Sequence, residues 1–252
     1  MARIPRVRSK CNIYHILLRS INRETIFNDE EDIKRFLITV NKYKKVCGMD
    51  LFAYCVMSNH IHLLVRESGE SISDAIKRIS SSYVFWYNSK YEHCGHLFQG
   101  RFKSEAVESE AYFLTVLRYI HQKPVKAGIA RSILDYQWSS YREYFKLSAI
   151  VDSNFALEKF APDRTKARRL FQDFNLQDND DVCLDDEGKI SLSDSEVKDY
   201  LKKVGIKDPL GLKQFDKRRR DKVIRDLKLL NGVTIRQISR LTGISKSTVD
   251  RV

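Results

Sequence analysis

The stretch that decides the fold is CVMSNHIHLLV, residues 55–65. Apolar residues fill most of it, as in a buried β-strand, and Ser58 and Asn59 interrupt it as a turn would. Two strands are therefore expected, LFAYCVM before the turn and HIHLLVR after it. Because side chains alternate faces along a strand, His60 and His62 point the same way. Two neutral imidazoles on a rigid strand can hold a divalent metal ion. The alternative is a pair of hydrogen-bonded histidines at a sheet surface.

The segments around this pair alternate between strand and helix periodicity. In chain order they are a strand (11–20), a helix (29–48), the two strands above, a helix (71–91), a strand (101–107) and a helix (109–123). Pro124 is expected to end the last helix, since proline has no N–H to donate. The order β-α-β-β-α-β-α predicts an α+β fold: a ferredoxin-like antiparallel sheet with helices on one face.

The charge of the chain is strongly positive but unevenly spread. The net charge is +12, with 45 Lys and Arg against 33 Asp and Glu. Residues 1–150 carry +8, residues 151–212 carry −4, and residues 213–252 carry +8. We expect three parts with these boundaries, the acidic one being an accessory or linker segment. Nucleic acid is the natural partner of two separate basic parts, because binding to phosphates gives sequence-independent affinity. A merely soluble basic protein is the alternative.

The cysteines and the apolar segments indicate the compartment. The five cysteines include no C-x-x-C pair, which fits free thiols in a reducing cytoplasm. The basic N-terminus leads into no long apolar core, and no apolar run is long enough to span a membrane. We therefore expect a cytoplasmic protein with no signal peptide and no membrane partner.

The third predicted helix carries a candidate nucleophile. Tyr119 lies in its middle, next to Arg118 and four residues before Lys123. A tyrosine phenolate is a competent nucleophile when its pKa is lowered or when a metal activates the phosphate that it attacks. Position alone favours the alternative, in which Tyr119 is one of twelve tyrosines and packs in an amphipathic helix.

The C-terminal forty residues have the rhythm of a helix-turn-helix module. TIRQISRLTG predicts a first helix, Gly243 a turn, and SKSTVDRV a second helix capped by Ser245. The stretch resembles the helix-turn-helix of the DnaA C-terminal and resolvase types, although a plain helical hairpin is the alternative. In such motifs the second helix enters the major groove of duplex DNA. The residues expected to face DNA are Lys246, Ser247, Thr248 and Arg251.

Four motifs taken together resemble a known family. They are NHIHLLV, GHLFQGRFKSEAVES, YIHQKPVKAG and YQWSSYREY, between about residues 10 and 145. This set resembles the single-tyrosine HUH transposases (IS200-like), and most closely the REP-associated tyrosine transposases. In that family the H-x-H pair binds Mg²⁺ or Mn²⁺, and the tyrosine attacks single-stranded DNA, which leaves a 5′-phosphotyrosine link and a free 3′-hydroxyl. The resemblance implies His60 and His62 as metal ligands, Tyr119 as nucleophile, and a ferredoxin-like catalytic core.

One position departs from the family pattern. The family usually has Asn or Gln, a third metal ligand, four residues after the tyrosine, where this chain has Lys123. Residues four apart share a helix face, so Lys123 should point at the metal site. A protonated amine cannot ligate a metal, but it could contact the scissile phosphate. Arg101, Lys103 and Arg118 are further candidate phosphate contacts.

The resulting hypothesis is a metal-dependent DNA transposase. Its parts would be a catalytic domain (1–150), an acidic accessory segment (151–212) and a helix-turn-helix module (213–252). The expected partners are a single-stranded DNA hairpin and flanking duplex, bound by a monomer or homodimer. Lys123 leaves open a non-catalytic DNA-binding regulator on the same fold. A nuclease that uses the histidines without a tyrosine intermediate is a third possibility.

Overall fold

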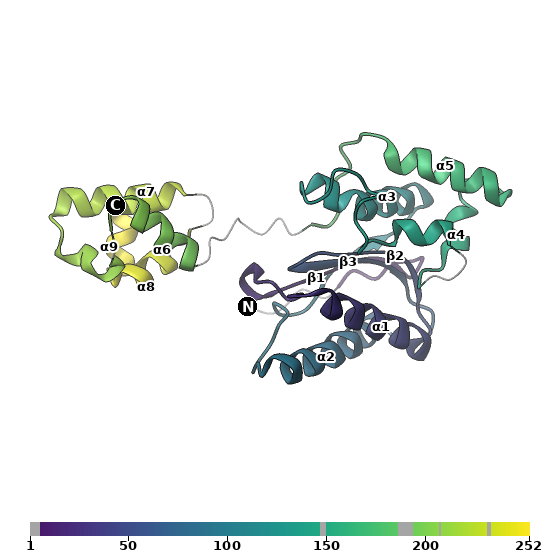
Figure 1. Cartoon of the computed structure of the whole chain (residues 1–252), viewed down its shortest axis with the longest axis horizontal. Helices are drawn as coiled ribbons and strands as arrows, with labels where there is room; N and C mark the ends of the chain where they lie inside the picture. Colours follow the sequence, from purple (N-terminus) through teal and green to yellow (C-terminus); the bar gives the residue numbers. More distant parts are fainter. Residues whose placement is uncertain (1–5, 147–149, 186–193, 207, 231–232) are drawn as a thin grey trace. The chain divides into compact units, whose positions relative to one another are not determined.

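The chain folds into two units that are each built around their own apolar core. The computed structural model describes residues 6–146, 150–185, 194–206, 208–230 and 233–252. The units are Met1–Asp186 and Glu187–Val252. Figure 1 shows the first as a sheet with helices and the second as helices alone. The predicted α+β fold is therefore confirmed, and the elements in the described residues of the second unit are helices.

The sheet of the first unit has four strands. They are β1 (Ile13–Arg19), β2 (Asp50–Val56), β3 (His60–Arg66) and β4 (Lys103–Val107). All three pairings are antiparallel, and the order across the sheet is β2-β3-β1-β4. This is the ferredoxin-like order, with β1 and β3 in the centre. The fourth strand begins at Lys103, two residues later than the expected start at 101.

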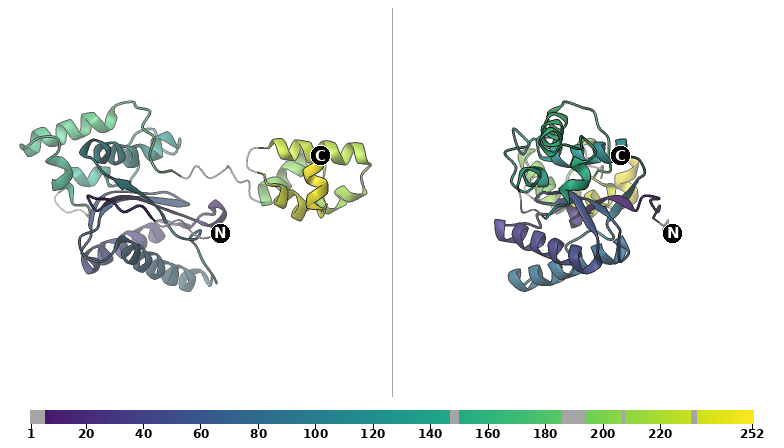
Figure 2. Two further views of the ribbon diagram at one scale, coloured as in Figure 1. Left: turned by 180° about the vertical axis from the view of Figure 1, so that it is seen from behind. Right: turned by 90° about the vertical axis from the view of Figure 1, so that its right-hand side faces the viewer.

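The helices of the first unit cover both faces of this sheet, as the two views in Figure 2 make plain. They are α1 (Glu30–Cys47), α2 (Ile72–Tyr91), α3 (Glu110–Lys126), α4 (Ser153–Leu157) and α5 (Arg164–Leu176), with 3₁₀ turns η1 (Ile21–Arg23) and η2 (Ser140–Phe145). Helices α1 and α2 lie on one face, and α3, α4 and α5 on the other. The prediction of helices on one face was wrong. Ile16 and Leu17 point to opposite faces of β1 and both are buried, so each face needs a cover.

Helix α3 is the element that carries the candidate nucleophile. Ser109 caps its start by accepting a hydrogen bond from the Tyr112 amide. The prediction that Pro124 ends the helix was wrong, because α3 continues to Lys126. Pro124 lies in the last turn, where its missing N–H removes a single hydrogen bond, and its ring is buried against the core. The extra residues extend the face that carries Tyr119 and Lys123.

The second unit is a small helical bundle. Its elements are α6 (Asp194–Lys203), η3 (Pro209–Gln214), α7 (Lys217–Leu229), α8 (Ile235–Thr242) and α9 (Lys246–Arg251). Gly243 ends α8 with φ of 65°, a left-handed conformation that favours glycine. Ser245 then caps α9 by accepting a hydrogen bond from the Thr248 amide. The two predicted helices and their turn are therefore present.

The division into units does not match the expected boundaries at residues 150 and 212. Helices α4 and α5 bury Leu157 and Phe171 in the core of the first unit. Helix α6 buries Val197 and Leu201 in the core of the second unit, together with residues of α7, α8 and α9. The expected acidic segment is thus shared between the two units, since each of its helices has an apolar face that needs burial.

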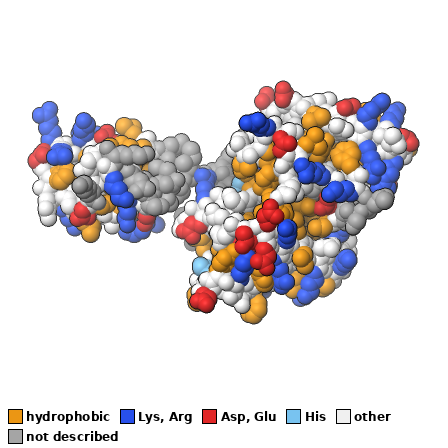
Figure 3. All heavy atoms as spheres, viewed as in Figure 1, with side chains coloured by type: hydrophobic (Ala, Val, Ile, Leu, Met, Phe, Trp, Pro, Cys, Tyr) orange, Lys and Arg blue, Asp and Glu red, His pale blue; other side chains and the backbone are white. Residues whose placement is uncertain are grey.

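The surface carries charge of both signs. On the face shown in Figure 3, Lys and Arg side chains are interspersed with Asp and Glu over both units. The excess of positive charge is therefore not gathered into one stripe on that face. In the described part of the chain, no helix combines the length and apolar character that crossing a membrane requires.

Candidate active site

The two histidines of β3 lie on the sheet face beneath α3. His62 is fully buried and His60 is half-buried, and their ring centroids are 5.2 Å apart. The ring of Tyr119, from α3, lies edge-on at 5.9 Å from the ring of His62. Residues separated by nearly sixty positions in the sequence are thus brought together by the packing of α3 on the sheet. This is the grouping that the sequence predicted.

His60 is oriented by a chain of local hydrogen bonds. Its Nδ1 lies 2.7 Å from Oδ1 of Asn59. The amide nitrogen of Asn59 donates to the carbonyl of Arg23, which orients Oδ1 toward the imidazole. An amide oxygen only accepts, so the proton of neutral His60 is on Nδ1. The lone pair of its Nε2 is then the one suited to a metal ion.

His62 is oriented by a residue that the sequence analysis missed. Nε2 of His15, from β1, lies 2.9 Å from Nδ1 of His62. On the other side of the His15 ring, Nδ1 lies 3.9 Å from a carboxylate oxygen of Glu105, from β4. The His15 ring is fully buried and lies 6.0 Å from the Tyr119 ring. Three strands therefore contribute to the surroundings of His62.

Burial keeps His62 neutral. Removal from water lowers the pKa of His62 well below its ordinary value, and the neighbouring His15, His60 and Lys123 lower it further. Burial also lowers the pKa of His15, although Glu105 opposes that shift. A neutral imidazole has the free lone pair that metal binding requires.

The donor set fits a divalent ion in part. Nε2 of His62 is buried and has no hydrogen-bond partner, which suits an atom that is reserved for a ligand. Among the described residues, however, no group of three or more His, Cys, Asp or Glu side chains is placed to hold a metal. Two imidazoles are thus the protein ligands that the described residues offer, which leaves further positions for water or phosphate oxygens.

Lys123 lies at the nucleophile itself. Its Nζ donates to Oη of Tyr119 at 3.2 Å and also forms an ion pair with Asp185. The lysine is one turn after the tyrosine on α3, as the spacing predicts. The contact with Asp185 was not expected, because the segment after α5 has no periodicity that fixes its position. The ammonium group is therefore shared between the nucleophile and a carboxylate.

Arg118 makes its contacts away from the histidines. Its guanidinium donates two hydrogen bonds to Asp181, at 2.8 and 2.9 Å, and lies over the ring of Phe174. Lys126, two turns along α3, donates to the side chain of Asn179. Residues 177–185, called here the α5 tail, thus follow α3 and engage the cations on it. That Arg118 contacts phosphate stays a prediction. In this structure its guanidinium is paired with the carboxylate of Asp181.

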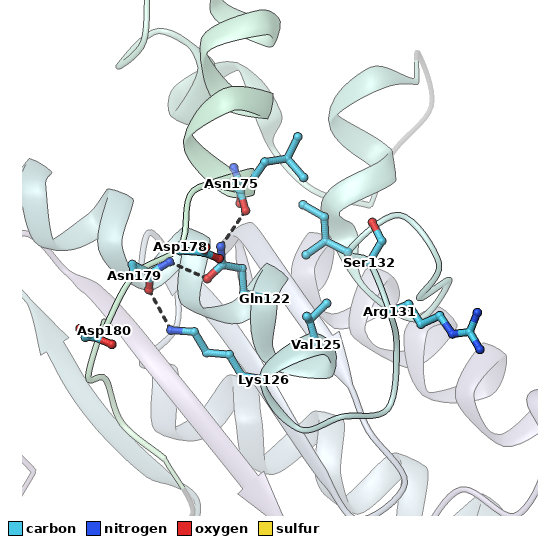
Figure 4. Close-up of a pocket in the computed structure, with 11 residues that line it drawn as sticks. Gln122, Val125, Lys126, Arg131, Ser132, Asn175, Asp178, Asn179 and Asp180 are labelled. Atoms are coloured by element: carbon cyan, nitrogen blue, oxygen red, sulfur yellow. Dashed lines mark hydrogen bonds between the residues drawn. The ribbon is translucent and has the colours of Figure 1, made fainter.

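A pocket beside the α5 tail does not belong to this site. It is bordered by the C-terminal end of α3, including Gln122 and Lys126, and by Asn175 and Asn179 (Figure 4). Gln122 is hydrogen-bonded to Asn175 and Asn179, and Asn179 is hydrogen-bonded to Lys126, while Arg131 points away from these residues. Tyr119 and the histidines are not among its lining residues.

The other cations predicted to contact DNA lie farther out. Lys103 is exposed and pairs with Leu17, which in turn pairs with His62 across the sheet, so it shares the histidine face. Arg101 is exposed and precedes β4 instead of forming part of it. Arg19, which the sequence analysis did not single out, pairs with His60 on the same face.

The histidine on α3 has a structural role. Both nitrogens of His121 are engaged, Nδ1 with Asn175 and Nε2 with Ser140, each at 2.9 Å. The ring lies edge-on to Tyr141, Tyr144 and Phe171. Burial lowers the pKa of His121 to about 4. It is not a substitute for the missing third ligand.

In the second unit, α9 presents polar side chains at the surface. Lys246, Ser247 and Arg251 are exposed, and Thr248 is half-buried. Val249, on the opposite side of the helix, is fully buried. The helix therefore has one face in the core and one available to a partner.

Comparison with known proteins shows what the first unit is similar to. The family model described as "Transposase IS200 like" matches residues 8–123. One similar solved structure is a REP-associated tyrosine transposase bound to a REP hairpin, with 17% identity, a TM-score of 0.49, and coverage of 57% of this chain and 86% of that one. Another is a putative transposase from Deinococcus radiodurans R1, with 21% identity, a TM-score of 0.34, and coverage of 48% and 98%. No curated protein matches the chain.

Proposed function

Since residues 8–123 belong to the IS200-like transposase family, we propose that the chain is a DNA transposase that cuts and rejoins one DNA strand through Tyr119. The observation that carries the proposal is the position of the Tyr119 phenol, whose ring lies 5.9 Å from the ring of His62 and whose oxygen accepts a hydrogen bond from the amine of Lys123. A nucleophile beside a pair of imidazoles and a cation is an arrangement suited to attack on a phosphodiester.

The reaction divides into roles for named groups. Oη of Tyr119 forms a bond to phosphorus while the bond from phosphorus to the 3′ oxygen breaks. The phenol loses its proton, and the departing 3′ oxygen takes one up. The products are a 5′-phosphotyrosine link and a free 3′-hydroxyl, and rejoining reverses these steps with another 3′ end. The ammonium of Lys123 stabilises the negative charge on the phosphate oxygens.

His60 and His62 would hold the divalent ion, Mg²⁺ or Mn²⁺, through Nε2. The unpartnered Nε2 of His62 and the engaged Nδ1 atoms of both rings support this assignment. Bound there, the ion would polarise the scissile phosphate. Lys123 supplies charge at the position where the family usually has a third ligand.

The second unit would bind duplex DNA next to the cleaved strand. Its support is the α8–turn–α9 arrangement with the exposed side chains of Lys246, Ser247 and Arg251. Thr248 would contribute from the edge of the same face. The substrate is then a single-stranded hairpin with flanking duplex, for which each unit recognises one part.

A covalent-adduct assay tests the proposal. The full chain is incubated with hairpin DNA labelled at its 3′ end, with Mn²⁺ or with chelator, beside Tyr119→Phe. A labelled protein band that requires both metal and Tyr119 is the expected result. Cleavage without an adduct would instead indicate a hydrolytic nuclease.

One observation favours a second candidate, a DNA-binding regulator without catalysis. Lys123 stands where a metal ligand is usual, and its amine is paired with Asp185. Tight hairpin binding with neither adduct nor cleavage, across several hairpins, would establish that alternative.

A further inference from the structure

The contacts around His15 suggest a function for a residue that lies outside the H-x-H motif. His15 is fully buried, and burial of a polar ring costs free energy unless its nitrogens interact with polar partners. Its Nε2 is engaged by Nδ1 of His62, and its Nδ1 faces the carboxylate of Glu105. Nε2 is thus committed to His62, while Nδ1 has no hydrogen-bond partner and lies 3.9 Å from a carboxylate oxygen of Glu105. Ligation of a metal ion by His15 would disrupt this arrangement.

Only one arrangement of protons satisfies the whole chain of groups. The carboxylate of Glu105 can accept but not donate, so it favours a proton on Nδ1 of His15. Nε2 of neutral His15 is then an acceptor, and the proton between the two rings belongs to Nδ1 of His62. This leaves the lone pair of His62 on Nε2. The opposite arrangement would direct a lone pair of His15 at a carboxylate and would place a proton on Nε2 of His62.

Glu105 carries the negative charge at one end of the series Glu105, His15 and His62. The neighbouring His15 and Tyr112 side chains and a hydrogen bond from the Leu184 amide lower its pKa, so it is ionised at neutral pH. At 3.9 Å the contact with His15 is an electrostatic one, longer than a hydrogen bond. Such a contact still distinguishes between the two tautomers in a buried setting.

We propose that His15, oriented by Glu105, is a positioning residue that fixes the tautomer and orientation of His62, so that Nε2 of His62 is available to a divalent ion. This inference rests on the proposed function only for the identity of the ion. His60 needs no such partner from another strand, because Asn59 performs the same task locally. The two ligands are therefore supported in different ways, one by the adjacent residue and one by a chain that crosses three strands.

The test uses the full chain and two variants of His15. His15→Leu removes the acceptor for Nδ1 of His62, and His15→Gln restores one through its amide oxygen. His121→Leu is the matched control, since it also removes a buried, doubly bonded histidine from the same unit but leaves His62 untouched. Long-range ¹H–¹⁵N NMR on metal-free protein reads the tautomer of His62, and Mn²⁺ titration followed by EPR reads the affinity.

The expected NMR result is a proton on Nδ1 of His62 in the unaltered chain and in His121→Leu, and its loss in His15→Leu. The Mn²⁺ affinity should fall about 10- to 100-fold in His15→Leu, recover largely in His15→Gln, and stay unchanged in His121→Leu. Glu105→Leu should shift the tautomer in the same direction as His15→Leu, to a smaller extent.

Two results would overturn the inference: a proton on Nε2 of His62 in the unaltered chain, or a tautomer and an affinity that do not change in His15→Leu. The NMR measurement needs neither metal nor DNA. Failure of the unaltered chain to bind Mn²⁺ would therefore count against the proposed function, while the tautomer would still decide the role of His15.

Discussion

The cations of the two units differ in what already surrounds them. On α3 of the first unit, Arg118 and Lys123 are paired with Asp181 and Asp185 of the α5 tail. On α9 of the second unit, Lys246 and Arg251 are exposed, and Arg251 donates a hydrogen bond to the carbonyl of Ser247 in its own helix. In the proposed function, a single DNA strand would therefore compete with carboxylates of the α5 tail. Within the described part of the second unit, neither Lys246 nor Arg251 forms an ion pair with a carboxylate.

The burial of the nucleophile leads to the same conclusion. The Tyr119 side chain is only 4% exposed, although the proposed reaction requires its oxygen to reach a phosphorus atom. Part of the surrounding protein must therefore move when a strand binds. The α5 tail contacts α3 through ion pairs with Arg118 and Lys123 and a hydrogen bond with Lys126. Polar contacts of this kind exchange for water and phosphate more readily than apolar ones do. The comparison between the units can be tested at four levels.

The largest expected effect is on catalysis. Replacing Lys123 with Met keeps the length of the side chain but removes the charge beside Tyr119. Because one charged donor to a reacting group is commonly worth about 10²-fold in rate, adduct formation should slow by about that factor. The measurement is the single-turnover rate of adduct formation at saturating hairpin DNA.

Lys123→Gln is the matched variant, since it restores the type of ligand that the family usually has. It should be faster than Lys123→Met and more sensitive to metal concentration. A Lys123→Met protein that is faster than the unaltered chain would show that the lysine suppresses catalysis, and would favour the regulator.

The next effect concerns stability in acid. All six histidines lie before residue 122, in the first unit. His121 is buried and neutral, with a pKa of about 4 against 6.5 when exposed. Between these values the unfolded chain binds more protons than the folded one, so stability falls as the pH falls. By pH 5 the loss from His121 alone should be roughly 2 kcal/mol.

Calorimetry of the full chain at pH 7 and pH 5 measures this effect. The melting temperature of the first unit should fall by roughly 4–8 °C for a loss of that size. The second unit has no histidine, and its Asp194 has a lowered pKa, so its transition serves as an internal control. Equal shifts of both transitions would contradict the assignment of the acid sensitivity to buried histidines.

The difference between the units also explains what the sequence could predict. The α8–turn–α9 arrangement depends on neighbours: Gly243 ends one helix and Ser245 caps the next. Such local signals are readable from the sequence. The order of strands and helices along the chain was predictable for a related reason, since each strand has its own local pattern of apolar residues.

The surroundings of Tyr119 depend instead on residues that are distant in the sequence. His15 is 47 positions from His62, and its role follows only from the register between β1 and β3. A histidine within an apolar strand indicates a buried polar contact, but the sequence does not show which residue makes that contact. Asp185 could not be placed at all, because the α5 tail has no periodicity and its position depends on ion pairs with α3. The prediction that Pro124 ends α3 failed because a proline in the last turn of a helix disrupts few of its hydrogen bonds.

A smaller effect is expected from the carboxylate that competes with DNA. Asp185→Asn removes the charge paired with Lys123 while keeping nearly the same shape. The freed lysine can neutralise one phosphate more, so the affinity for single-stranded hairpin DNA should rise roughly 3- to 10-fold at low salt, and the salt dependence should steepen by about one counterion. Fluorescence anisotropy across a salt series measures both quantities.

Asp135→Asn is the control for that change, since Asp135 is an exposed acid of the same unit. It removes the same charge without releasing Lys123. If both variants raise the affinity equally, the increase comes from the change in net charge. That result would contradict the prediction that Asp185 competes with DNA for Lys123.

The smallest effect belongs to the second unit. Lys246→Ala should weaken duplex binding by about threefold and lower the salt slope by about one, because an exposed lysine contributes one phosphate contact and no fold stability. Lys198→Ala, at an exposed position of α6, removes the same charge from the same unit and should change neither quantity. The two variants should leave hairpin cleavage by the first unit unchanged when the substrate lacks flanking duplex. If Lys246→Ala weakens binding to the bare hairpin as much as binding to the duplex, the two units do not recognise different parts of the DNA, and the contrast between their cations has no functional meaning.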